Sequence, residues 1–146
     1  EVDIQKYCSV NFEDGKYSWE AFFSSPHDND IHILFWDTYH QVLIGYGENI
    51  FALNLANGDE NWHINCADPI WELQLTPDET GLIVHEELSI KRINSDGNVI
   101  WDCFWGEIIC SMELKDGLIK ITDFNEQQFA IDWELGKVLH SKMSLR

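Results

Sequence analysis

The 146-residue sequence predicts an all-β protein built from antiparallel, four-stranded repeats. Three observations support this prediction. Gly58, Gly97 and Gly136 are each 39 residues apart, and short stretches of alternating polarity flank each of them. In addition, no window of a dozen residues keeps the apolar spacing of an amphipathic helix. We therefore expect a repeat protein whose elements are short strands joined by tight turns.

Each repeated glycine marks a turn between two strands. The stretches IFALNLANG, SIKRINSDG and QQFAIDWELG alternate in polarity and then reach the glycine, which supplies a positive φ where the strands reverse. Four places after these glycines stand Trp62, Trp101 and His140. Gly15 and Trp19 form an additional copy of the same spacing, closer to the N-terminus.

Two further apolar stretches precede each of the three later hairpins. They are IHILFW and QVLIGY, then IWELQL and GLIVHE, then IICSMEL and GLIKITDF. One repeat therefore contains four strands in about forty residues, the size of a β-propeller blade. We predict a single domain over residues 1–146, with a half-unit at 5–25 and complete units at 31–66, 70–105 and 108–143.

The repeats resemble those of pyrroloquinoline-quinone-type β-propellers, in which an A-x-D-x-x-T-G-x-x-x-W pattern closes each blade. The stretches FALNLANGDENW and FAIDWELGKVLH carry the resemblance, which extends over about residues 8–143. It implies that the glycine turns between the outer strands and that the tryptophan is buried between blades. The sequence departs from the pattern at His140, and Asn57, Asp96 and Leu135 stand where the family has threonine.

The number of repeats predicts a partial or open β-propeller. Three and a half units are fewer than the roughly four to eight blades of a closed ring. Three arrangements remain open: an open twisted stack, an imperfect closure in which the N-terminal strands cover the last edge, and pairing with a second chain. Exposed strand edges need protection by charge or by a partner, which the acid-rich strands can provide.

The charge distribution predicts a basic partner. The chain has 26 acidic and 9 basic side chains, a formal net charge of −17, and no Lys or Arg between residues 17 and 90. Such a surface repels the phosphates of nucleic acids and anionic lipids, and it attracts basic proteins. Solubility alone is the alternative explanation of this charge.

No catalytic or metal-binding motif is evident in the sequence. The histidines lack close ligand spacing, the four cysteines form no C-x-x-C pair, and the quinone and metal residues of the quinoprotein dehydrogenases have no counterpart. The acidic segment HDNDIH lacks the glycine and the distal glutamate of a calcium loop, so we interpret it as a lengthened turn. We expect no enzyme activity, no cofactor and no metal, and free, mostly buried thiols in a cytoplasmic protein.

These observations favour a non-enzymatic protein-binding module. Its sharpest form is an acidic immunity protein or inhibitor that neutralises a basic toxin such as a nuclease, by occupying the cationic cleft that binds phosphate. The alternatives are a structural or scaffold module completed by oligomerisation, and an enzyme or ligand sensor with a site at the blade centre. The candidate partner-binding residues are Asp28, Asp30, Asp37, Glu48, Glu86, Glu87, Trp71 and Trp105.

Overall fold

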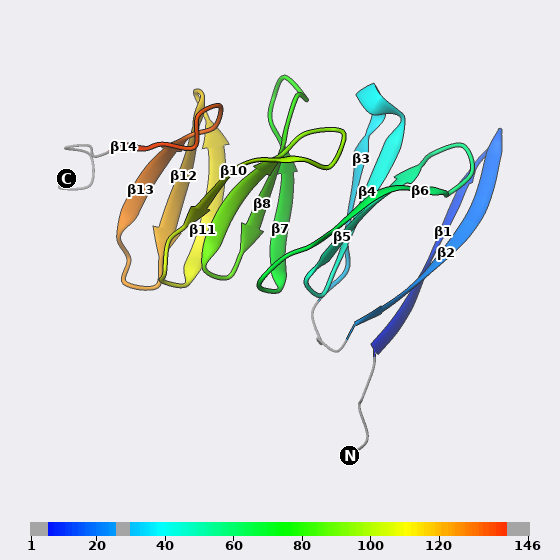
Figure 1. Ribbon diagram of the computed structural model, residues 1–146, viewed down its shortest axis with the longest axis horizontal. Helices are drawn as coiled ribbons and strands as arrows, with labels where there is room; N and C mark the ends of the chain where they lie inside the picture. The colour runs from blue at the N-terminus through cyan, green and yellow to red at the C-terminus, as the bar shows by residue number, and fades with distance from the viewer. Residues whose placement is uncertain (1–5, 26–29, 140–146) are drawn as a thin grey trace, which may run out of the picture. The chain divides into compact units, whose positions relative to one another are not determined.

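The computed structural model describes residues 6–25 and 30–139. Apart from one short 3-10 helix, Asp37–Tyr39, every regular element within these residues is a β-strand (Figure 1), which confirms the all-β prediction. The chain divides into two compact halves, Glu1–Leu73 and Gln74–Arg146. None of the described residues forms a helix long and apolar enough to cross a membrane.

The N-terminal half contains a hairpin and one complete four-stranded sheet. The hairpin pairs β1 (Lys6–Asp14) with β2 (Tyr17–Ser25). The sheet, which we call blade 1, has the order β3 (His32–Trp36), β4 (Gln41–Tyr46), β5 (Asn49–Asn54) and β6 (Glu60–Asn65). Neighbouring strands are antiparallel throughout, so each sheet is a simple meander.

Two further sheets follow in the chain. Blade 2 consists of β7 (Ile70–Leu75), β8 (Leu82–Glu86), β9 (Ser89–Ile93) and β10 (Val99–Phe104), and the boundary between the halves falls within β7. Blade 3 consists of β11 (Ile109–Lys115), β12 (Leu118–Asp123), β13 (Gln128–Asp132) and the short β14 (Val138–Leu139). The predicted repeat of four antiparallel strands is therefore confirmed.

A tight turn with a glycine and a capping Asn or Asp joins the two outer strands of each of the three blades. Gly58, Gly97 and Gly136 have φ values of 76°, 85° and 72°, the left-handed region that favours glycine. Before each glycine, an Asn or Asp side chain accepts a hydrogen bond from the backbone N–H two residues further on; these residues are Asn54, Asn94 and Asp132. This local cap explains why the repeat has Asn or Asp at that place.

Tryptophan side chains dock on these turns in both halves. Trp19 Nε1 donates to the carbonyl oxygen of Leu55 at 2.8 Å, and its ring lies so close to Gly58 that a Cβ there would meet it at 2.7 Å. Trp101 Nε1 donates to the carbonyl oxygen of Trp133 at 3.0 Å. Its ring leaves equally little room at Gly136, where a Cβ would approach to 2.5 Å. The rings are half-buried.

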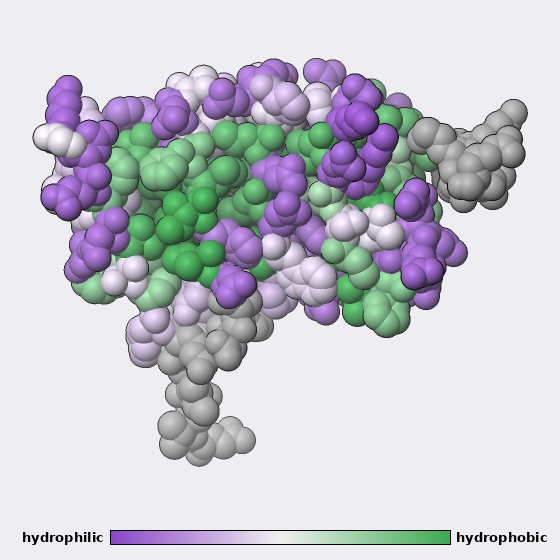
Figure 2. All heavy atoms as spheres, turned by 180° about the vertical axis from the view of Figure 1, so that it is seen from behind, coloured by the Kyte–Doolittle hydropathy of each residue, from purple (hydrophilic) through white to green (hydrophobic). Residues whose placement is uncertain are grey.

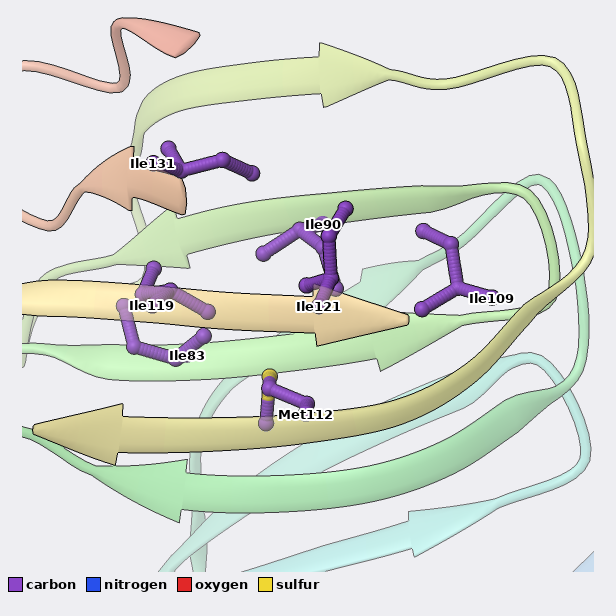
Figure 3. Close-up of a cluster of buried hydrophobic side chains, with 7 residues drawn as sticks. All are labelled: Ile83, Ile90, Ile109, Met112, Ile119, Ile121 and Ile131. Carbon is purple, nitrogen blue, oxygen red and sulfur yellow. The ribbon is translucent and has the colours of Figure 1, made fainter. Parts of the chain in front are cut away.

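Each half has its own apolar core. In the C-terminal half, side chains from blades 2 and 3 point toward one another (Figure 3): Ile83, Ile90, Ile109, Met112, Ile119, Ile121 and Ile131. In the N-terminal half, the hairpin packs on blade 1, and the buried residues are Phe23, Val42, Ile44, Tyr46, Leu53 and Leu55. The hairpin thus has the same relation to blade 1 as the outer strands of blade 2 have to blade 3.

Candidate protein-binding surface

Five of the candidate partner-binding residues lie in the N-terminal half, and the structure describes four of them. Asp30 and Asp37 are exposed, before and after β3, and so lie at opposite ends of that strand. Glu48 is half-buried in the turn between β4 and β5, where its Oε1 accepts a hydrogen bond from the Nδ2 of Asn65 at 3.4 Å. Trp71, in β7, is 42% exposed. Asp28 lies outside the described residues.

Glu86 is not a surface residue, so its assignment to a partner-binding surface was wrong. Its side chain is fully buried and forms an ion pair with Lys91, with 3.0 Å between Oε2 and Nζ. The hydroxyl of Ser89 donates to the same carboxylate oxygen at 2.9 Å. The residue that neutralises this carboxylate comes from the adjacent strand, β9.

The repeat explains why Lys91 is inside. At the same distance before the capping Asn or Asp, blades 1 and 3 carry Phe51 and Phe129, whereas blade 2 carries Lys91. The neighbouring Arg92 is also buried and donates to the carbonyl oxygen of Trp133 at 2.8 Å and to the Oγ1 of Thr80 at 2.9 Å. These internal charges could have been found in the sequence by aligning the three repeats, because Lys91 and Arg92 stand where the other two repeats have apolar residues.

The two remaining candidates in the C-terminal half, Glu87 and Trp105, make contacts within that half. Glu87 is half-buried, and its backbone carbonyl accepts a hydrogen bond from the N–H of Ile109 at 2.8 Å. Trp105 Nε1 donates to the Oδ2 of Asp123 at 3.2 Å, and its ring lies 3.8 Å from that of Phe129, centroid to centroid. Trp105 is therefore mainly a packing residue of the C-terminal half.

Two exposed apolar side chains on β3 were missed by the sequence analysis. Ile33 and Phe35 are 49% and 46% exposed, although the stretch HILFW reads as a buried strand. Both lie between the exposed carboxylates of Asp30 and Asp37. We call these four residues the β3 strip. Figure 2 shows apolar side chains gathered on the left of that view, on the side of the N-terminal half.

Other chemical features of the described residues are modest. No group of three or more His, Cys, Asp or Glu among them is placed to hold a metal ion. All four cysteines are free, with Cys66 buried, Cys8 and Cys103 half-buried and Cys110 exposed. Burial raises the pKa of the Cys8 thiol, and burial together with the charge of Asp102 raises that of Cys103, which keeps both thiols protonated at neutral pH.

A shallow depression of about 240 Å³ lies in blade 3. Its lining includes Ser111, Glu113, Lys120, Thr122, Gln128 and Ala130. These residues alternate along β11, β12 and β13 with the core residues Met112, Ile119 and Ile121, so they form the face that points away from the core. Ile121 and Phe129 also line the depression, so it is an open surface feature with both polar and apolar walls and not an enclosed ligand cavity.

Comparisons with known proteins support the fold. No protein-family model matches the chain, and no curated protein matches it in sequence. Among solved structures, the chain is similar to BamB from Moraxella catarrhalis, a pyrroloquinoline-quinone-like β-propeller, with a TM-score of 0.55 and 15% sequence identity. The similarity covers 68% of this chain and 32% of the BamB chain, so the chain spans about a third of that protein. The chain therefore has an all-β fold of four-stranded sheets that resemble propeller blades.

Proposed function

We propose that the chain is a non-enzymatic protein-binding module that recognises a basic protein. In the sharpest form of this proposal it is an immunity protein or inhibitor that neutralises a cationic toxin such as a nuclease. The observation that carries the proposal is the exposed β3 strip, in which two apolar side chains lie between two carboxylates in the more acidic half of the chain.

The charge of that half supports a basic partner. Residues 1–73 contain two basic and thirteen acidic side chains, a net charge of −11. Carboxylates at the rim of an interface accelerate the encounter with a cationic protein, and apolar side chains at its centre supply most of the binding energy. The β3 strip combines both kinds of residue, and the cationic cleft of a nuclease is complementary to it in charge.

The test begins with capture of partners from the lysate of the source cell, with the proteins encoded beside its gene expressed alongside. We expect one basic protein, bound stoichiometrically and released only at high salt. That protein, purified and mixed with the chain, should lose its activity in proportion to the chain added. A captured partner that is acidic, or one whose binding is independent of salt, would contradict the proposal.

The Asp37→Asn variant sharpens this test. Asp37 is an exposed residue of the β3 strip, so we expect weaker binding and a smaller dependence of affinity on salt. Asp96→Asn, at an exposed position in the C-terminal half, changes the net charge by the same amount and is the matched control. Equal effects of the two substitutions would show that net charge, and not this surface, attracts the partner.

A scaffold completed by oligomerisation is the second candidate function. The outer edge of β1, which pairs with none of the described strands, favours it, because such an edge can pair with another chain. The outward face of blade 3 does not favour it, since Lys120 and Gln128 are exposed where blade 2 has the core residues Ile83 and Ile90. A mass that rises with protein concentration, measured by sedimentation, would identify this function.

A further inference from the structure

The N-terminal hairpin is the outer half of a blade. Gly15 and Trp19 have the same spacing as Gly97 and Trp101, so β1 and β2 correspond to β9 and β10. The docking is also the same, because Trp19 binds the glycine turn of blade 1 as Trp101 binds that of blade 3. Among the described residues, no strands stand beside the hairpin in the positions that β7 and β8 occupy in blade 2.

Because these strands are not found beside the hairpin among the described residues, the first strand of blade 1 is less buried than the first strand of blade 3. Paired residues run across the sheets in equivalent rows: Ile33, Ile44 and Phe51 in blade 1, and Met112, Ile121 and Phe129 in blade 3. Met112 is only 7% exposed, because β8 contacts β11 and places Ile83 in the same core. Ile33 is 49% exposed because no strand within residues 6–25 and 30–139 lies beside the hairpin as β8 lies beside β9.

Phe35 is also half-exposed, because no described strand covers it either. It occupies the row of Leu114, and its ring lies 6.0 Å from that of Phe12 in β1, centroid to centroid. Phe12 in turn stacks on Trp19 at 5.2 Å. The apolar side chains of the β3 strip therefore continue those of the hairpin without a polar residue between Phe35 and Phe12.

The free edge of β1 borders this apolar surface. β1 pairs with β2 over its whole length, from Lys6 with Ser25 to Asp14 with Tyr17, and with no other described strand. The register has no bulge, and β1 contains no proline, which are two common devices that block an edge. An extended segment placed along β1 can thus pair with the backbone and cover Ile33 and Phe35 at the same time.

We propose that this edge and the β3 strip together bind an extended segment of the basic partner, in the position beside β1 that β8 occupies beside β9 in blade 2. The segment is apolar at alternate residues, which face Ile33, Phe35 and Phe12, and it carries Lys or Arg residues that meet Asp30 and Asp37. This inference rests on the proposed function and names the part of the partner that is recognised. Charge complementarity selects the occupant, because the N-terminal half has a net charge of −11.

A second copy of the chain is a poorer occupant for the same reason. Pairing two β1 edges brings together two halves that each carry eleven excess negative charges. Like charges at a close interface oppose association, whereas a basic segment gains from the same field. The second copy is therefore one of the outcomes that the experiment distinguishes.

The probe is a synthetic peptide of alternating lysine and valine, as long as β1, whose binding to the whole chain is measured by fluorescence anisotropy. A peptide of alternating glutamate and valine is the charge control. The test variant is Ile33→Lys, and the matched control is Ile100→Lys, since Ile100 is 51% exposed in the C-terminal half and the charge change is identical. Circular dichroism and thermal unfolding of both variants serve as the check that they keep the fold.

We expect the lysine–valine peptide to bind and the glutamate–valine peptide not to bind. Ile33→Lys should weaken the affinity for the lysine–valine peptide about tenfold or more, and Ile100→Lys should change it less than about twofold. Hydrogen exchange should slow at the amides of β1 in the complex. Equal binding by the two variants would overturn the proposed location while leaving a basic partner in place. Failure of the peptide to bind would overturn the inference, and salt-dependent capture of an intact basic protein then decides the proposed function separately. If the chain forms a dimer that Ile33→Lys abolishes, the inference is overturned, and the occupant of the β1 edge is a second copy of the chain.

Discussion

The two halves of the chain contain the same tryptophan–glycine contact, but they differ in how much of the next blade's first strand is covered by other strands. A tryptophan seated on a glycine turn joins the hairpin to blade 1 and blade 2 to blade 3. Only the C-terminal half adds β8 over the next blade, so Met112 is 7% exposed and the equivalent Ile33 is 49% exposed. Docking is thus a property of the outer hairpin alone, whereas burial of the first strand requires the inner strands.

The halves also differ in charge. The C-terminal half has seven basic and thirteen acidic side chains, a net charge of −6, against −11 for the N-terminal half. Two of its basic residues, Lys91 and Arg92, are buried and bind groups of the same half. The more acidic half is also the one with the uncovered strand, which is why we place the binding surface there.

The largest expected effect comes from a charge at the two equivalent positions. Met112→Lys buries an ammonium group in the core and should lower the free energy of unfolding by about 4 kcal/mol or more. Ile33→Lys places the same group at a half-exposed position and should cost less than about 1 kcal/mol. Urea denaturation of both variants measures the difference. Similar costs would mean that Ile33 is covered in solution.

The next effect concerns the internal ion pair that distinguishes blade 2 from the other blades. Glu86→Ala leaves Lys91 buried without this carboxylate and should lower the free energy of unfolding by roughly 3 kcal/mol. Glu87→Ala, at the half-buried neighbouring position, is the control and should have little effect. If the two variants unfold at the same urea concentration, the pair contributes nothing specific.

A somewhat smaller effect tests whether the tryptophan contacts are equivalent in the two halves. Trp19→Ala and Trp101→Ala should each lower the free energy of unfolding by about 2–3 kcal/mol, below the range for fully buried rings, since both are half-buried. The corresponding Phe variants keep a ring and lose only the N–H donor, at about 1 kcal/mol. A much smaller loss at Trp19 than at Trp101 would break the equivalence on which the half-blade interpretation depends.

The smallest effect is a pH dependence confined to the C-terminal half. Hydrogen bonds from the side chains of Thr76 and Thr80, and from the Thr80 N–H, lower the pKa of Asp78 to about 2, with a contribution from Arg92. Because this pKa lies below that of the unfolded chain, the stabilisation is complete above about pH 4 and is lost as the pH falls toward 2. NMR titration of the Asp78 carboxyl checks the value. Thr80→Ala should raise the pKa, and an unchanged pKa would refute the assigned cause.

The strands were predictable because their signals are local. A glycine turn, an Asn or Asp cap and alternating polarity lie within a dozen residues of one another, and the repetition of that pattern in the sequence identifies the blade. The candidate surface was predicted less well. Asp30 and Asp37 are exposed as expected, whereas Glu86 is buried. The burial of Glu86 was not predictable from its own strand, since Lys91, which neutralises it, is on another strand.

The sequence by itself determined that the chain is all-β, that its unit has four strands and that the charge is strongly negative. It also predicted that the N-terminal hairpin is half of such a unit. Only the tertiary structure decided which apolar side chains are covered. Ile33 and Met112 occupy equivalent positions in their sheets, and their burial differs because β8, which is distant in the sequence, covers Met112, whereas no described strand covers Ile33 in this way. Burial depends on such non-local packing, which alternation of polarity along one strand does not encode.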